Sequence, residues 1–157
     1  MFNVGFTDLL LIWLAAVVLM AAVIDARTFT ISNRLNLTVA LAAPLYWLSM
    51  GLAPWPGVAI QLAAGAITFS VLAGAFYAGM MGGGDVKLAA ALALWFSPAT
   101  TVRILVLMSL AGGVLTIGLV LWHRAKRREG RPEIPYGVAI AFGALAILAQ
   151  RFLNQFV

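Results

Sequence analysis

Two aspartates are the residues of this sequence best suited to catalysis. The 157-residue chain has only five acidic residues, which are Asp8, Asp25, Asp85, Glu129 and Glu133. Glu129 lies in the basic stretch 123–131 and Glu133 lies beside it, where solvated counter-charges are expected. Asp8 lies near the N-terminus. Asp25 ends the first apolar run of the chain, whereas Asp85 follows three glycines in "GGGDVKLAAALALWF". Asp25 and Asp85 therefore need an explanation.

Two carboxylates that lie close together have a characteristic chemistry. They cannot both ionise cheaply, so they hold one proton between them and titrate as a coupled pair. One carboxylate can then take a proton from water while its protonated partner donates to a carbonyl oxygen, which is the chemistry of aspartic peptide hydrolysis. Gly82, Gly83 and Gly84 would let a substrate backbone approach closely and leave Asp85 free to shift.

Other roles for the two aspartates stay open. Asp85 could be the N-cap of the following helix, a role that does not exclude catalysis. Asp25 could be an ordinary interfacial residue, although at a helix C-terminus it gains nothing from the helix dipole. Acids within membrane segments are otherwise expected to be functional. The alternatives to a peptidase are a proton-coupled transporter and a non-catalytic scaffold subunit. Acids at one membrane edge argue against the transporter, whose sites usually lie at the midplane, and the scaffold leaves Asp25 unexplained.

The elements that must position these aspartates are membrane helices. The chain is 64% hydrophobic and 10% charged, whereas soluble domains average about 45–50% apolar and 25% charged residues. A spanning helix needs about 20 mostly apolar residues. Five runs are long enough, at about 7–24, 36–53, 57–80, 101–122 and 134–152, and a shorter one covers 86–96. We expect residues 1–157 to form a single transmembrane domain without a soluble domain.

The basic residues decide whether the short run crosses the membrane. If it crosses, six spans leave only Arg103 and Arg151 on the side opposite the other eight, which are Arg27, Arg34, Lys87, Arg124, Lys126, Arg127, Arg128 and Arg131. If it does not cross, this asymmetry nearly disappears. The positive-inside rule thus predicts an all-α membrane protein of six helices with a short fourth one, and both aspartates at the cytoplasmic edge. The stretch 123–131 is expected to face anionic lipid rather than nucleic acid.

The metal-binding side chains are scarce. The sequence has no cysteine and one histidine, His123, beside the basic stretch. This excludes thiolate zinc sites and leaves only bare carboxylates as ligands. We expect chemistry that needs neither a metal nor a cofactor.

Three motifs resemble those of one enzyme family. "GGGDVK" at 82–87 resembles the G-x-G-D motif of the GxGD aspartic membrane proteases. "IDARTFTISNRLN" at 24–36 is similar to the first-aspartate segment of bacterial type IV prepilin peptidases. "IPYGVAIAFGAL" at 134–145 resembles the opening of their last helix, especially in the short form that serves tight-adherence (Flp) pili. The motifs occur in the same order and reach across most of the chain.

The resemblance implies roles for individual residues. Asp25 and Asp85 match the catalytic aspartates, and the matched motif positions are Gly82, Gly83, Gly84, Lys87, Asn33, Pro135 and Tyr136. For three of these an ordinary role is also open: Lys87 as an interfacial anchor, Asn33 as the cap of the second helix, and Tyr136 as an anchor rather than part of a substrate groove. Ser32 departs from the family, which usually has proline there.

The resemblance also implies a substrate. It implies removal of the short basic leader of a prepilin, a Flp-type pilin or pseudopilin, at the cytoplasmic face of the bacterial inner membrane. Longer relatives carry a cytoplasmic domain with paired C-x-x-C motifs and methylate the new N-terminus. Because this chain has no cysteine and no room for that domain, we expect no methyltransferase activity. The expected partners are the prepilin and membrane lipid, and no nucleic acid.

Overall fold

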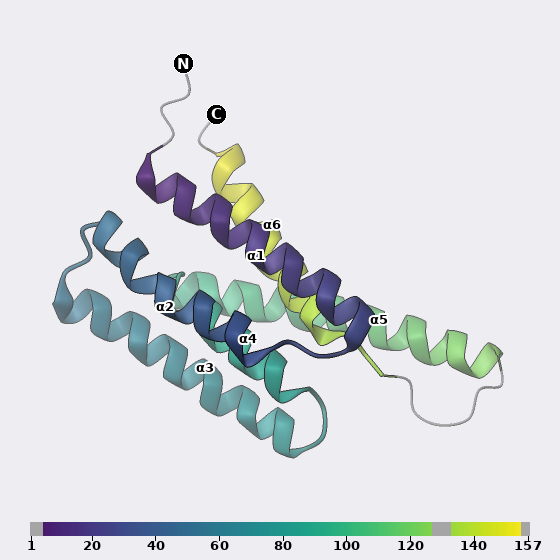
Figure 1. Cartoon of the computed structure of the whole chain (residues 1–157). Coiled ribbons are helices and arrows are strands. Elements are labelled where there is room, and N and C mark those ends of the chain that lie inside the picture. The colour runs from purple at the N-terminus through teal and green to yellow at the C-terminus, as the bar shows by residue number, and fades with distance from the viewer. Residues whose placement is uncertain (1–4, 127–132, 155–157) are drawn as a thin grey trace.

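The computed structural model describes residues 5–126 and 133–154, and within these ranges it contains six α-helices and no strand (Figure 1). The helices are α1 (Phe6–Thr28), α2 (Asn33–Ser49), α3 (Ala59–Tyr77), α4 (Gly83–Ala93), α5 (Pro98–Ala125) and α6 (Tyr136–Leu153), and a short irregular segment, Pro54–Val58, leads into α3. Each helix corresponds to one predicted apolar run, so the all-α prediction is confirmed. Most of the basic stretch, with Glu129, lies outside the described residues.

Four of the described helices are long and apolar enough to cross a membrane. They are α1, α3 with the segment before it, α5 and α6. The other two are shorter: α2 has 17 residues and α4 has 11. At 1.5 Å per residue, α4 covers about 16 Å of a hydrocarbon core about 30 Å thick. Length and composition therefore support four of the six predicted spans.

The short helix α4 lies in the interior of the bundle. It contacts α2, α3, α5 and α6, and seven of its 11 residues are buried. Leu88 and Leu92 are 0% and 1% exposed, and the following Trp95 donates its indole N–H to the carbonyl of Val39. An isolated helix of this length is marginal, so its neighbours must supply most of its stability.

The helices expose apolar faces on the outside of the bundle. On α5, large exposed side chains recur every three or four residues, at Val102, Val106, Leu110, Val114, Ile117 and Leu121. A continuous apolar face of this length would be a liability in water, but it suits contact with lipid acyl chains.

The course of the chain gathers the functional residues at two ends of the bundle. The last turn of α1 and the first turns of α4 and α6 meet at one end, which holds both aspartates. The end of α2, the starts of α3 and α5, and the end of α6 gather at the other. The N- and C-terminal ends of the described chain also lie together, away from the last turn of α1 (Figure 1).

The turn between α1 and α2 reverses the chain beside the first end. Phe29 takes a left-handed conformation with φ of 52°, and its N–H donates to the carbonyl of Asp25 at 2.8 Å. Ser32 is the N-cap of α2, and its Oγ accepts the N–H of Leu35 at 3.3 Å. Ser32, which stands where the resembling motif usually has proline, thus caps the helix. The predicted capping role of Asn33 was wrong, because Asn33 is the first residue of α2.

Candidate active site

Asp25 lies in the last turn of α1 and is 2% exposed. Its Oδ2 accepts the backbone N–H of Gly137 at 2.7 Å. Gly137 belongs to the first turn of α6, so Asp25 lies at the positive end of that helix dipole. A Cβ on Gly137 would lie 2.8 Å from Oδ2 of Asp25 and 2.7 Å from Cδ1 of Ile31. The carboxylate therefore fits against α6 because residue 137 has no side chain.

Asp85 lies in the first turn of α4 and is 7% exposed. The N-cap of α4 is Gly82, so the interpretation of Asp85 as the N-cap was wrong by three residues. Oδ2 of Asp85 accepts the N–H of Gly82 at 3.1 Å, which fixes the carboxylate to the start of its own helix. Its Oδ1 is buried and has no hydrogen-bond partner among the described residues. One oxygen of Asp85 is thus available for another group.

The two carboxylates are electrostatic neighbours. Asp85 lies outside the four candidate membrane spans. Burial, and next the negative charge of Asp25, raise the pKa of Asp85 to about 7, against the opposing hydrogen bond from Gly82. Ile31 lies between the surroundings of Asp25 and those of Asp85, because it contacts the start of α6 at Gly137 and the start of α4 at Gly84. The structure therefore brings the two predicted aspartates into one buried site.

The glycines before Asp85 have distinct surroundings. A Cβ on Gly84 would lie 2.7 Å from the carbonyl oxygen of Ile31, which is backbone and cannot move aside easily. A Cβ on Gly82 would lie 2.9 Å from Oδ2 of Asp85, and one on Gly83 would lie 3.4 Å from the ring of Phe76. The close approach of the turn after α1 thus explains why residue 84 is a glycine.

Asn36 is a site residue that the sequence analysis missed. It is 5% exposed, and its Nδ2 donates to the carbonyl of Gly84 at 2.9 Å, which ties α2 to the glycine segment. Its Oδ1 is buried without a partner in the described part of the chain. The available signal was a polar residue on the face of α2 that also carries the buried Leu35 and Val39.

Lys87 and Asn33 form an exposed pair beside the site. Nζ of Lys87 donates to Oδ1 of Asn33 at 2.7 Å, and no hydrogen bond joins Lys87 to either aspartate within residues 5–126 and 133–154. The prediction that Lys87 and Asp85 point to different faces of α4 agrees with this geometry.

Pro135 and Tyr136 open α6. Pro135 is the N-cap of the helix and Tyr136 is its first residue. The ring of Tyr136 packs on α5, where a Cβ on Gly112 would lie 3.2 Å from its Cε1. These two residues place Gly137 against Asp25, so the last motif belongs to the same end of the bundle.

A groove runs along the side of α4 that faces α2 and α3. It has a volume of about 590 Å³ and lies between α2, α3 and α4. Its floor includes the small residues Gly65, Ala66, Ala90 and Ala91. Asn33 of α2 and Lys87 of α4 line its polar end, and Lys87 is less than one turn from Asp85 along α4.

The only side chains at the site that could act as metal ligands, among the described residues, are the two carboxylates. Within the described ranges, no three histidine, cysteine, aspartate or glutamate side chains gather in a way that could hold a metal ion. The arrangement has instead two buried carboxylates that are close enough for the charge of Asp25 to raise the pKa of Asp85.

A bundle with helices able to span a membrane and a buried carboxylate pair at one end defines a multi-pass membrane protein with a two-acid site. The chain belongs to the type IV leader peptidase family, whose profile matches residues 11–117. The matched residues include Asp25, Asp85 and the glycine segment, whereas α6 lies beyond them. No curated protein and no solved structure matches the chain at a significant level. The protein is accordingly a peptidase of the leader-peptidase type.

Proposed function

We propose that this protein is an aspartic endopeptidase that removes the short basic leader of a prepilin, of the Flp pilin or pseudopilin type. The observation that carries the proposal is the neighbouring pair Asp25 and Asp85, both less than 10% exposed, in a chain of the type IV leader peptidase family. The site needs no cofactor for this reaction, and we propose no methyltransferase activity.

The two carboxylates divide the chemistry between them. The ionised carboxylate removes a proton from a water molecule, whose oxygen attacks the carbonyl carbon of the scissile peptide bond. The protonated carboxyl donates its proton to the carbonyl oxygen, which gives a neutral tetrahedral intermediate. The C–N bond then breaks, the amine leaves with the proton taken from water, and one hydroxyl of the intermediate returns its proton to the carboxylate that acted as donor, which leaves the new carboxyl group and restores the pair. We assign the proton donor to Asp85, whose pKa is raised to about 7, and the base to Asp25, which accepts the N–H of Gly137.

The groove between α2, α3 and α4 suits the apolar helix that follows the leader. Its small side chains allow close helix approach, and its polar end includes Lys87, two residues after Asp85 in the chain. A helix lying there would present its N-terminal junction to the carboxylates. Ala66→Phe should narrow the groove and raise KM, whereas Ile117→Phe, on the exposed face of α5, should not.

The membrane orientation follows the charge distribution. We propose six spans in the bacterial inner membrane, with α2 and α4 crossing inside the bundle. Both aspartates and the first turn of α4 then lie in the interfacial layer at the cytoplasmic edge, outside the hydrocarbon core. The eight-to-two split of basic residues supports this orientation. The leader of the substrate and the active site then share one side of the membrane.

Cleavage of a cognate prepilin tests the proposal. Wild type, Asp25→Asn and Asp85→Asn are compared in liposomes, with the product identified by N-terminal sequencing. Each change should lower the rate by at least about a thousandfold, because neither half of the acid–base pair works alone. A variant that cuts the same bond at near wild-type rate would show that the aspartate pair is not the catalyst. Proton flux through the wild type without cleavage would instead favour a transporter.

A further inference from the structure

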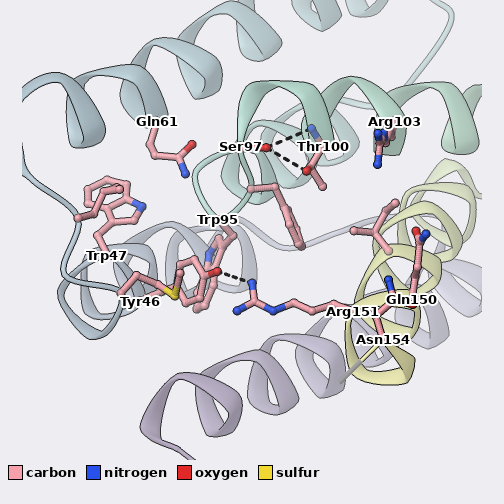
Figure 2. Close-up of a pocket in the computed structure, with 14 residues that line it drawn as sticks. Tyr46, Trp47, Gln61, Trp95, Ser97, Thr100, Arg103, Gln150, Arg151 and Asn154 are labelled. Carbon is pink, nitrogen blue, oxygen red and sulfur yellow. Dashed lines mark hydrogen bonds between the residues drawn. The ribbon is translucent and has the colours of Figure 1, made fainter. Parts of the chain in front are cut away.

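A second cavity lies at the end of the bundle away from the aspartates, and the proposed peptidase reaction does not use it. It has a volume of about 510 Å³ and is lined by residues from the end of α2, the starts of α3 and α5, and the end of α6 (Figure 2). Arg103 and Arg151 both line it, and its 14 lining residues include no aspartate or glutamate. The cavity therefore carries positive charge without an acidic partner in its wall.

The guanidinium of Arg151 is held in place at one point. Its Nη1 donates to the hydroxyl of Tyr46 at 2.8 Å, and the Tyr46 ring stacks on Trp95 with centroids 5.3 Å apart. Tyr46 and Trp95 are 6% and 1% exposed, so this support is rigid. In Figure 2 the Arg151 side chain extends from α6 toward Tyr46. Because a guanidinium has five N–H donors, most of them stay available to a ligand.

Further polar groups surround the two arginines. The hydroxyls of Ser97 and Thr100 lie 2.9 Å apart at the start of α5, where the helix dipole is positive. Gln61 lines the cavity from α3, and its side-chain amide carries an NH2 donor. The wall thus combines positive charge with hydrogen-bonding groups that a polar anion can use.

We propose that this cavity binds a phosphate group, and that in the membrane this phosphate belongs to a phospholipid headgroup. Guanidinium groups bind phosphate oxygens through paired, charge-assisted hydrogen bonds. The cavity lies at helix ends, where the headgroup layer meets the protein, and its wall continues into apolar residues such as Leu52 and Ile147. Arg103 and Arg151 are also the two basic residues that the proposed topology places apart from all the others. Their role is then to hold a lipid on that face.

Native mass spectrometry of the intact protein in detergent micelles tests this site. Three probes are compared: phosphatidylglycerol, a diacylglycerol with the same acyl chains and no phosphate, and inorganic phosphate as a competitor. One phosphatidylglycerol should bind at least about tenfold more tightly than the diacylglycerol, and Arg103→Gln/Arg151→Gln should remove this preference. Arg34→Gln removes an exposed charge at the start of α2, at the other end of the bundle, and should leave binding unchanged.

Two results would overturn the assignment. Equal affinity of the wild type and the double variant for phosphatidylglycerol would exclude the arginines as its site. Binding of inorganic phosphate with no preference for the lipid over the diacylglycerol would make the occupant a free anion. Because Arg151 contacts Tyr46, Arg103→Gln alone and Arg151→Lys are measured as well. Arg103 is exposed and should be replaceable without unfolding the protein, so a lipid affinity unchanged by Arg103→Gln would also count against the site.

Discussion

The two aspartates of the site are held in opposite ways. Asp85 is fixed by its own helix, since it accepts the N–H of Gly82 three residues earlier. Asp25 is fixed by a distant one, since it accepts the N–H of Gly137, which lies 112 residues later. The position of Asp85 is therefore a local property of the chain, and that of Asp25 depends on how α6 docks. Changes at α6 should consequently be the most damaging ones outside the carboxylates themselves.

Gly137→Ala is expected to have the largest effect. The new Cβ would lie 2.8 Å from both Cγ and Oδ2 of Asp25, so the carboxylate or the start of α6 must move. Displacement of a reacting group by about 1 Å can cost about a hundredfold in rate, and we expect prepilin cleavage to fall by at least that factor. Cleavage is measured beside helix content by circular dichroism.

Gly113→Ala is the matched control for this change. Gly113 lies on an exposed part of α5, and a Cβ there would have no atom within 4 Å. Its cleavage rate should equal that of the wild type. A Gly137→Ala protein that cleaves within threefold of the wild type would show that Asp25 does not depend on α6.

The second prediction addresses the other aspartate through pH. Because the pKa of Asp85 is raised to about 7, its proton is present at lower pH and is lost as the pH rises through that value. Loss of the proton donor should lower kcat/KM by about tenfold per pH unit above pH 7. The rate is measured from pH 6 to 9 at constant ionic strength. Asp8→Asn, which changes an acid at the far end of α1, should leave the profile unchanged, and a flat profile in the wild type would contradict the assignment.

The third prediction concerns the link between α2 and the glycine segment. Asn36→Leu removes the donor to the Gly84 carbonyl, which would stay buried without that bond. That carbonyl keeps its bond within α4, so the loss is that of one hydrogen bond, and the free energy of unfolding should fall by about 1 kcal/mol. Denaturant unfolding in detergent measures it. Asn33→Leu, three residues earlier on the exposed side of α2, should change stability by about 0.5 kcal/mol or less. Equal losses in both variants would refute a specific role for Asn36.

The contrast between local contacts and contacts between distant segments also explains what the sequence could predict. The apolar runs predicted all six helices, because a membrane helix is a local property of about 20 residues. Asp85 and its glycines form a local motif, so their place at the start of α4 was predictable to within three residues. The hydrogen bonds from Asn36 to Gly84 and from Gly137 to Asp25 join residues 48 and 112 positions apart. No local pattern encodes such pairs, and they emerge only when the helices pack.

The smallest effect is expected for Lys87, although it lies closest to Asp85 in the sequence of all the charged residues. Its ammonium bonds Asn33 on the exposed side of α4, and residues two apart on a helix do not face each other. An exposed polar pair contributes little to stability, so Lys87→Gln should change the free energy of unfolding by less than about 0.5 kcal/mol. It should change kcat by less than about threefold and leave the pH midpoint of cleavage in place. A midpoint displaced by a full pH unit would show instead that Lys87 acts on the carboxylate pair. In that case the short sequence distance between Lys87 and Asp85 would matter more than the different faces of α4 on which the two side chains lie.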